Sequence, residues 1–522
     1  MAINKKRDSW GSRLGIIMAV AGSAIGLGNF LRFPAKAVSN GGGAFLIPYF
    51  VALLLLGIPL MWIEWTLGRF GGGFEHGTAP GIFHSLWRKN RFIKYFGIIG
   101  IFGPLVIFIY YIYIESWTLA YSFFALIGKY SHLADQASMQ SFLRGFQGIE
   151  NNQYFQGIGW AYLFFLITFV LNAAVLYYGI KGGIEKLCKW AMPVLFICGF
   201  ALMIRVFTLG TPDPARPDWN ILNGLGFLWN PDFSALRSAK VWLEAAGQIF
   251  FTLSVGIGVI LTYASYLSKG DDVVLSGLTA SGTNEFAEII LGGSIIIPAA
   301  FIFFGPVEIK TIAQSGVFNL GFVTMPLILN NLPWNALFGF LWFFLLFLAG
   351  ITSSVSLAQP AVAFLEDEFD IKRGKAVLIF SIATFILCQP AIFFLKNGVV
   401  DELDFWGGTF FIVLFATIET ILFAWVFGMD NAWNEIHKGA DMKVPRVYKF
   451  IIKYITPSFL FFILGMWFWQ EWIPVIFMKG VSAGNHVYIV ATRMGLLLIL
   501  VILAILVKVS WRNKKRLLEQ KE

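Results

Sequence analysis

The sequence predicts an all-α protein that crosses a membrane many times. Of its 522 residues, 57% are hydrophobic and only 13% are charged, whereas a soluble domain has about 25% charged residues. About twelve stretches reach the roughly 20 apolar residues that a bilayer-spanning helix needs. Two of them, the first and the sixth, are interrupted by glycines. These observations predict a polytopic transport protein in a lipid bilayer and give no reason to expect a nucleic-acid partner.

The predicted spans follow one another with short connections. They run near 13–38, 42–70, 93–126, 160–180, 187–209, 239–268, 274–304, 336–366, 374–396, 402–428, 447–475 and 484–511. The Pro-, Asp- and Trp-containing stretch 211–238 is predicted to be an extracellular loop. The segment from Ile312 to Leu332 is broken by Gly316, Gly321 and Pro326, so we expect a re-entrant or capping loop there.

Basic residues predict the orientation. The N-terminal segment, alternate loops and the C-terminal tail are rich in Lys and Arg, and the opposite loops are poorer in them. Because cytoplasmic loops carry surplus Lys and Arg, we expect both termini in the cytoplasm, in agreement with an even number of spans. The net charge of +9 has the same explanation. The N-terminus has no small-residue cleavage site, so it is predicted to be retained.

The first span is interrupted at Gly22, Gly26 and Gly28, with Asn29 and Arg32 just beyond. Irregular backbone at membrane depth occurs only where it is buried in protein or lines a cavity, and it often forms a binding site there. Close helix packing by small residues is the alternative. Asn29 and Arg32 favour a binding site, because polar groups at this depth are costly and usually functional.

The sixth span has a similar interruption, in which Thr252 and Ser254 precede Gly256 and Gly258. Five spans separate the starts of the two broken segments. Since five is odd, the second set would begin on the opposite side of the membrane, which predicts a 5+5 inverted repeat of the kind found in transporters. Two unrelated clusters of packing glycines would give the same pattern by chance.

Further polar residues lie inside apolar spans. Asn284 and Glu288 are four residues apart and share a helix face. Thr352 and Ser353 offer oxygen ligands of the kind that hard cations prefer, although such hydroxyls also bond to their own helix carbonyls. Tyr111 is a candidate to contact a substrate. No nucleotide-binding loop, catalytic nucleophile motif or clustered His/Cys set occurs, so we expect a transporter driven by an ion gradient rather than an enzyme.

Several motifs together resemble the neurotransmitter:sodium symporter family, in particular its bacterial leucine-transporting members. The motifs are Ser23-Ala-Ile-Gly-Leu-Gly-Asn-Phe-Leu-Arg-Phe-Pro34, 40–45, 59–65, 110–111, 248–254, 275–280, 350–354 and 364–367. The resemblance implies a LeuT-like fold of twelve transmembrane helices with a 5+5 inverted repeat and broken helices 1 and 6. The implied organisation is a cytoplasmic segment 1–12, a first repeat 13–210, the loop 211–238, a second repeat 239–428, and helices 11 and 12 with the cytoplasmic tail at 429–522.

The resemblance also implies two sodium sites. The first would use Ala24, Asn29, Thr252 and Asn284 together with the substrate carboxylate, and the second would use Gly22, Ile25, Ala349, Thr352 and Ser353. The substrate would contact Ala24, Leu27, Gly28, Ile107, Tyr111, Phe251, Thr252, Ser254, Ile257, Ser353 and Leu357. Its carboxylate would meet the amides of Leu27 and Gly28 and the Tyr111 hydroxyl, because half-helix N-termini attract anions.

Two positions bear on specificity. Relatives that carry monoamines have an aspartate at the position of Gly26, so the glycine implies a substrate with its own carboxylate, that is, an amino acid. Glu288 stands where chloride-dependent members have a serine near Tyr49, Gln248, Thr252 and Asn284, so its carboxylate implies chloride independence. The pocket is apolar apart from hydroxyls, with Ile257 in place of phenylalanine and Ile107 in place of valine, which leaves a leucine-like and a larger side chain both open.

The resemblance implies gates on both sides of this site. The outer gate would pair Arg32 with Asp404, backed by Tyr111 and Phe251. The inner gate would pair Arg7 with Asp367, supported by Trp10, Ser265 and Tyr266. Ordinary surface ion pairs are the alternative explanation for such residues.

The sequence is thus interpreted as a sodium-coupled importer of a hydrophobic amino acid in a bacterial inner membrane, working by alternating access, with a possible homodimer. A carrier of another carboxylated zwitterion, such as a betaine or a gamma-amino acid, stays an alternative, and a gated channel is a more distant one.

Overall fold

A computed structural model describes residues 8–519 of the chain, with side chains up to residue 513. Within these residues the protein is helical and contains no β-strand beyond an isolated bridge between Gly42 and Pro231, which confirms the predicted all-α class. Among the described residues, ten continuous helices are long and apolar enough to cross a membrane, and a bent pair, Arg13–Ala24 with Gly28–Ser39, makes an eleventh. The sixth predicted span, split into two shorter helices, completes the twelve.

The first half of the chain contains spans one to five and their connections. Its elements are α1 Arg13–Ala24, η1 Gly28–Arg32, α2 Phe33–Ser39, η2 Gly43–Phe45, α3 Leu46–Ala52, η3 Leu53–Gly57, α4 Ile58–Gly72, α5 Ala79–Leu86, α6 Ile93–Phe96, α7 Ile99–Leu126, α8 Gln136–Phe146, α9 Gly159–Tyr177, η4 Ile180–Glu185 and α10 Lys186–Phe207. The helix α8 lies in the connection between the third and fourth spans.

The middle of the chain contains spans six to eight. Its elements are α11 Ile221–Trp229, η5 Phe233–Arg237, α12 Ala239–Leu253, α13 Val259–Ala264, α14 Val274–Glu285, η6 Phe286–Gly293, α15 Ser294–Gln314, α16 Val317–Asn319, η7 Leu320–Thr324, α17 Met325–Asn330 and α18 Asn335–Phe369. The stretch 211–238, predicted as a loop, carries the helix α11, which packs against α15. An apolar run of nine residues is too short to be recognised as a helix by its periodicity alone.

The remaining elements form spans nine to twelve. They are α19 Arg373–Phe393, η8 Leu395–Asn397, α20 Val399–Leu403, η9 Asp404–Phe410, α21 Phe411–Ile421, η10 Leu422–Val426, α22 Met429–Ile436, α23 Val447–Phe450, η11 Ile451–Ile455, α24 Thr456–Trp467, η12 Phe468–Trp472, α25 Ile473–Ile476, η13 Ala483–Asn485 and α26 His486–Glu519.

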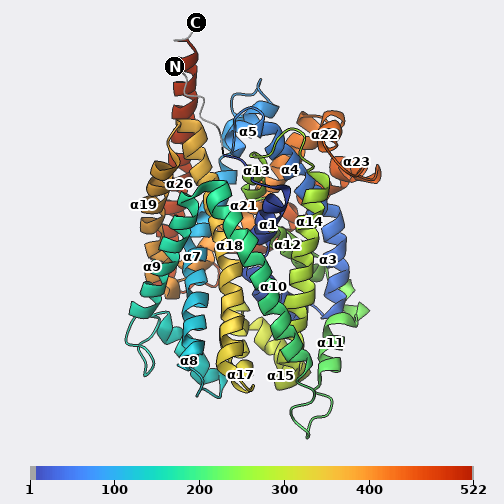
Figure 1. The fold of residues 1–522 in the computed structure, drawn as a ribbon, viewed down its shortest axis with the longest axis vertical. Helices are drawn as coiled ribbons and strands as arrows, with labels where there is room; N and C mark the ends of the chain where they lie inside the picture. Colours follow the sequence, from blue (N-terminus) through green and yellow to red (C-terminus); the bar gives the residue numbers. More distant parts are fainter. Residues whose placement is uncertain (1–7, 520–522) are drawn as a thin grey trace.

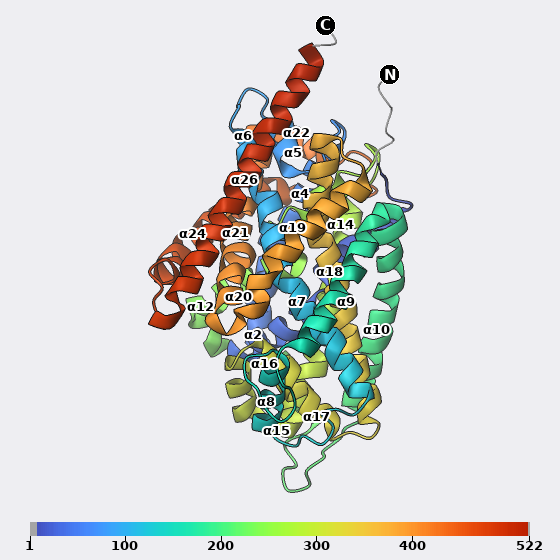
Figure 2. The ribbon, with the colours of Figure 1, turned by 90° about the vertical axis from the view of Figure 1, so that its left-hand side faces the viewer.

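The helices form a bundle with α1, α7 and α18 near its centre. The apolar stretch of the span containing α7 is 94% buried, whereas that of α26 is 17% buried. Accordingly, α26 and α24 lie on the outside of the bundle (Figure 2). The central helix α18 packs against α7, α10 and α1. The residues predicted to form the site therefore lie on the most enclosed helices.

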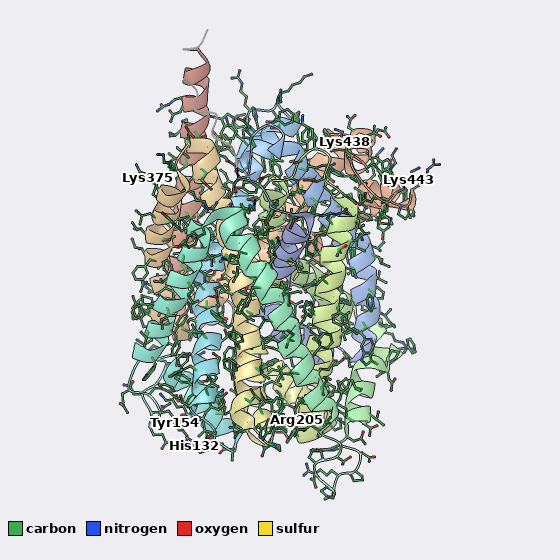
Figure 3. The ribbon with its side chains drawn as sticks, in the orientation of Figure 1. His132, Tyr154, Arg205, Lys375, Lys438 and Lys443 are labelled. Carbon is green, nitrogen blue, oxygen red and sulfur yellow. The ribbon has the colours of Figure 1, made fainter. Side chains whose placement is uncertain are left out.

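The two ends of the described chain lie together. The beginning of the described chain and the last turns of α26 lie at the same end (Figure 1). Lys375, Lys438 and Lys443 lie at this end, whereas His132, Tyr154 and Arg205 lie toward the other (Figure 3). This arrangement agrees with an even number of crossings and with the alternation of basic loops along the sequence.

Candidate functional site

The first span breaks after Ala24, and side chains hold the broken backbone. The helix α1 ends at Ala24. The next residue, Ile25, has non-helical φ and ψ of −74° and 88°, and the helical stretch that follows is bent by 46° relative to α1. The amide of Gly26 donates to Asn29 Oδ1 at 2.9 Å, and the amide of Leu27 donates to the Tyr111 hydroxyl at 3.2 Å. The break is thus closed by polar side chains rather than by helix hydrogen bonds.

The sixth span breaks between α12 and α13. Ser254, Gly256 and Gly258 all have positive φ values of 55°, 75° and 88°, which is the region that favours glycine. The Gly256 amide donates to the carboxylate of Glu64 on α4, and the Ser254 hydroxyl donates to the carbonyl of Ser23 at 3.1 Å. Glu64 was not predicted as a site residue, although a carboxylate in an apolar span is a signal of function.

The two breaks meet at a buried cluster of amides and a hydroxyl. Asn29 Nδ2 lies 2.8 Å from the Asn284 side chain and 3.2 Å from Thr252 Oγ1, and Asn284 lies 2.9 Å from Thr252 Oγ1. In its alternative orientation, the Asn284 amide reaches the carbonyl of Ala24 at 3.3 Å. The structure therefore brings together the four residues predicted for the first sodium site, with an oxygen-rich ligand set suited to a hard cation.

Glu288 lies next to this cluster and is buried. Its carboxylate accepts from Gln248 Nε2 at 2.8 Å and from Asn29 Nδ2 at 3.0 Å, and it also accepts from the Thr252 hydroxyl. Tyr49 donates its hydroxyl to the neighbouring Glu285 at 2.6 Å. The residues named for the chloride region of relatives thus surround a carboxylate in this chain.

A second cluster joins α1 to α18. Ser353 Oγ lies 3.4 Å from the carbonyl of Gly22 and 3.0 Å from that of Ala349. Thr352 Oγ1 donates to the carbonyls of Leu348 and Ala349 at 2.9 and 3.2 Å. Of the residues predicted for the second sodium site, Gly22, Ala349, Thr352 and Ser353 come together, and Ile25 lies in the adjoining break. In the described conformation, the hydroxyls bond to helix carbonyls.

All the predicted substrate contacts are buried except Phe251, which is partly buried. By comparison, the predicted sodium ligands Asn284 and Thr352 are fully buried. Eight of the substrate contacts keep an exposed fraction of 4–8%, namely Ala24, Leu27, Ile107, Tyr111, Ser254, Ile257, Ser353 and Leu357. Gly28 lies directly under Phe251, since a Cβ on Gly28 would come within 2.5 Å of the Phe251 ring.

The outer gate residues do not form an ion pair with each other in this conformation. Arg32 stacks over the Phe251 ring, 4.4 Å from its centroid, and Asp404 accepts from the Tyr110 hydroxyl at 2.5 Å. Phe251 was predicted to support this gate, and the contact with Arg32 agrees with that. The predicted pairing of Arg32 with Asp404 stays a prediction for another state of the protein.

The inner gate is described only in part, because Arg7 lies outside the described residues. Trp10 donates to the carbonyl of Tyr263 at 3.0 Å and packs edge-on against its ring. Tyr266 accepts from Gln359 at 3.0 Å. The segment before α1 is thus attached to α13 at the end of the bundle where the chain begins.

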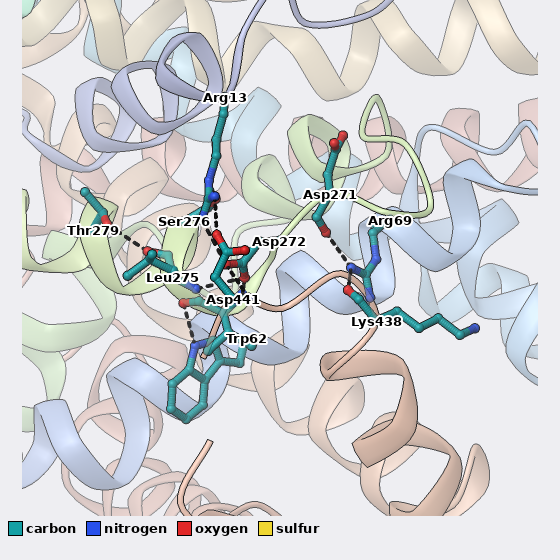
Figure 4. Close-up of polar contacts among 11 residues, drawn as sticks. Arg13, Trp62, Arg69, Asp271, Asp272, Leu275, Ser276, Thr279, Lys438 and Asp441 are labelled. Carbon is teal, nitrogen blue, oxygen red and sulfur yellow. Dashed lines mark hydrogen bonds and ion pairs between the residues drawn. The ribbon is translucent and has the colours of Figure 1, made fainter. Parts of the chain in front are cut away.

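An ion-pair cluster at the same end was not predicted from the sequence. Arg13 contacts Asp272 at 2.8 Å, Asp441 at 2.5 Å and Ser276 at 3.2 Å, so that α1, α14 and the loop after α22 meet at one side chain (Figure 4). The hydrogen bond and charge of Arg13 lower the pKa of Asp441. The sequence could not predict these contacts, because Arg13 lies more than 250 positions away from both Asp272 and Asp441.

The family model named sodium:neurotransmitter symporter family matches residues 7–133 and 128–514. The chain belongs to this family. It is 33% identical over 460 residues to an uncharacterized sodium-dependent transporter of Methanocaldococcus jannaschii, covering 87% of this chain and 89% of the relative. The chain is 26% identical over 539 residues to the sodium- and chloride-dependent glycine transporter 2 of Xenopus laevis, covering 91% of this chain and 66% of that protein.

A solved structure has the same fold. The crystal structure of MhsT in complex with L-phenylalanine aligns with a TM-score of 0.74 and 29% identity, covering 88% of this chain and 99% of MhsT. The family assignment makes this symporter a sodium-dependent, multi-pass membrane transporter of a small-molecule substrate, and not an enzyme.

Proposed function

We propose that this symporter couples sodium to the import of a hydrophobic amino acid, leucine-like or larger, without a need for chloride. The observation that carries the proposal is the meeting of the two broken helices at Asn29, Thr252 and Asn284. A sodium ion held by these oxygens would share the substrate carboxylate as a ligand. Binding of either would then favour binding of the other, which is the linkage that coupled transport requires.

The carboxylate end of the substrate would lie at the break in helix 1. The amides of Leu27 and Gly28 begin a helical segment, and anions are favoured at such an N-terminus. Tyr111, within 3.2 Å of the Leu27 amide, would contribute its hydroxyl. A second sodium ion would be held between α1 and α18 by Gly22, Ile25, Ala349, Thr352 and Ser353.

Gly26 supports an amino acid rather than an amine that lacks a carboxylate. A Cβ at Gly26 would lie 2.9 Å from Ser353 Oγ and 3.0 Å from the Tyr111 hydroxyl. A side chain there would force the Ser353 hydroxyl to move and would crowd the Tyr111 hydroxyl. The glycine therefore leaves the two hydroxyls in place for a substrate that brings its own negative charge.

The side-chain pocket supports a hydrophobic substrate. Ile107, Ile257 and Leu357 would supply apolar surface for the substrate side chain together with Phe251. One methylene in such a pocket changes binding by only about 1–3 kcal/mol. The exact side chain is therefore a matter for measurement. MhsT, the structural relative, was crystallised with L-phenylalanine.

The buried carboxylate of Glu288 supports chloride independence. It lies against Gln248, Asn29 and Thr252, so a carboxyl group is available beside the proposed first sodium site, and its negative charge when ionised would take the place of a mobile anion. A mobile anion would be redundant there and would be repelled by an ionised Glu288.

Transport would proceed by alternating access. The halves 13–210 and 239–428 would move relative to each other in the inner membrane, with both termini in the cytoplasm. Arg32 with Asp404 would close the outside, and Arg7 with Asp367 would close the inside. Contacts that form in only one state supply the differential binding that such a cycle needs. A homodimer of such units is part of the proposal.

The first experiment is equilibrium binding of radiolabelled amino acids to the purified protein, in sodium and in potassium, with chloride absent. We expect sodium-dependent binding of one or a few hydrophobic amino acids. If no amino acid of the panel showed sodium-dependent binding but a betaine or a gamma-amino acid did, the substrate class would be another carboxylated zwitterion and not a hydrophobic amino acid. Non-saturable sodium flux without substrate binding would instead indicate a channel.

A further inference from the structure

A basic cavity lies at the end of the molecule where Lys438 and Lys443 are found (Figure 3). It has a volume of about 610 Å³ and is lined by Trp433, Asn434, His437 and Lys438 from the end of α22 and its following turn, and by residues 443–446. No acidic side chain is among these lining residues. The cavity is separate from the broken helices and has no part in the proposed transport site.

The nearby acids are already paired with other cations. Glu435 pairs with Lys438 and with the buried Arg69, Asp441 pairs with Arg13, and Asp430 pairs with Lys449 at 2.6 Å. Among the described residues, Lys443 and Arg446 make no ion pair, and both are exposed at the cavity. Two positive charges are therefore available to an anionic ligand.

Hydrogen bonds hold the cavity walls in place. His437 Nδ1 lies 2.8 Å from the carbonyl of Trp433, and its Nε2 lies 3.1 Å from the amide of Val444. Both contacts are satisfied at once by a neutral ring protonated on Nδ1. The carbonyl of Lys438 accepts from Arg69 at 2.6 Å, and Asp441 binds Arg13 and, through its amide, Asp272 (Figure 4). The ligand would thus meet a preformed site.

An exposed apolar surface continues from the cavity along the eleventh span. Val447, Phe450 and Tyr454 are 57%, 55% and 48% exposed, and their spacing places them on one helix face. In a membrane protein such a surface faces lipid chains. Basic cavities at helix ends next to this kind of surface bind the head groups of anionic lipids.

We propose that this cavity binds the phosphate of an anionic phospholipid, with Lys443 and Arg446 contacting the phosphate and the acyl chains lying along Val447, Phe450 and Tyr454. The guanidinium of Arg446 can bind two phosphate oxygens at once, and Lys443 adds a point charge. The same loop carries Asp441, so a bound lipid also stabilises the loop that connects Arg13 and Asp272.

The test measures lipid binding to delipidated, purified full-length protein by native mass spectrometry, with phosphatidylglycerol and phosphatidylcholine compared. The variant is the double substitution Lys443→Gln/Arg446→Gln. The matched control is Lys396→Gln/Lys479→Gln, which removes the same charge from exposed positions elsewhere on the protein. Neither lysine of the control lines the cavity.

We expect the affinity for phosphatidylglycerol to fall about 25-fold in the double variant, because each basic residue near an anionic surface contributes roughly a factor of five. The control is expected to keep its affinity, and phosphatidylcholine is expected to bind weakly to all three proteins. Equal phosphatidylglycerol binding by variant and control would overturn the proposal. If soluble sn-glycerol 3-phosphate bound as tightly as the lipid, the cavity would be a site for a free phosphate compound and not for a phospholipid head group. A thermal melt identical to that of the parent shows that a loss of binding is not a loss of fold.

Discussion

Glu288 and Gln248, forty residues apart on η6 and α12, are joined by a hydrogen bond of 2.8 Å in the buried centre of the protein. The contact places a carboxylate beside Thr252 and Asn29, both predicted ligands of the first sodium ion. A serine at this position would leave the site without a carboxyl group.

Glu288→Ser is therefore expected to make substrate binding dependent on chloride. In chloride-free buffer the variant loses a charge interaction close to sodium, and we expect at least a tenfold weaker apparent sodium affinity, equivalent to about 1.4 kcal/mol. Added chloride should restore it. The measurement is sodium-dependent amino acid binding with and without chloride, and Glu308→Gln, an exposed carboxylate on α15, is the control. Binding by Glu288→Ser that ignores chloride would contradict the role given to Glu288.

Thr352→Val tests the second proposed sodium site. The substitution replaces a hydroxyl by a methyl group of similar size, so the sodium concentration for half-maximal binding should rise roughly tenfold, as for the loss of about 1.4 kcal/mol. Thr279→Val removes a comparable hydroxyl that bonds to its own helix, at an exposed position on α14. Equal sodium dependence in the two variants would argue against Thr352 as a ligand.

Gly26→Ala tests the space beside the helix 1 break. The added methyl group would lie 2.9 Å from Ser353 Oγ and 3.0 Å from the Tyr111 hydroxyl, so one of them must move. Overpacking of this kind costs about 1–3 kcal/mol, and we expect a loss of substrate affinity of about 5- to 150-fold. Gly465→Ala is the control, because no atom lies within 4 Å of its added Cβ. Unchanged affinity in Gly26→Ala would show that the substrate does not use these hydroxyls.

Glu64 is predicted to stabilise the break in helix 6 through its contact with the Gly256 amide. Glu64→Leu leaves that buried amide without an acceptor, which costs about 1–3 kcal/mol, so the melting temperature and the substrate affinity should both fall. Glu64→Gln retains an oxygen acceptor and should lose less of each. The melting temperature and the substrate affinity are expected to be highest in the parent, lower in Glu64→Gln and lowest in Glu64→Leu. A Glu64→Leu variant as stable as the parent would contradict this role.

The sequence was sufficient for much of the fold because the signals are local. A run of about 20 apolar residues must be helical in a bilayer. The glycines at 22–28 and 256–258 interrupt two such runs, and this interruption is visible in the sequence whatever the packing of the helices. The helix α11 was missed, since nine residues with a short apolar run resemble a loop, and its position depends on packing against α15.

The site could be predicted from the sequence only through the family resemblance. Asn29, Thr252 and Asn284 are far apart along the chain, and no local pattern states that they meet. Arg13 is a further example, because its partners Asp272 and Asp441 come from two distant loops. Arg32 shows the opposite outcome: its predicted partner was Asp404, yet in this conformation it stacks on Phe251 and Asp404 bonds to Tyr110.

The sequence by itself determined that this protein is a polytopic helical membrane protein with two broken spans, because bilayer thickness and backbone hydrogen bonding leave a chain of this composition no other structure. The tertiary structure alone decided which oxygen atoms converge at the breaks and which charges pair at the end of the bundle where the chain begins. It also decided which cations beside the eleventh span have no ion-pair partner among residues 8–513. These are contacts between distant segments, and they depend on how whole helices pack rather than on any property of a single stretch of residues.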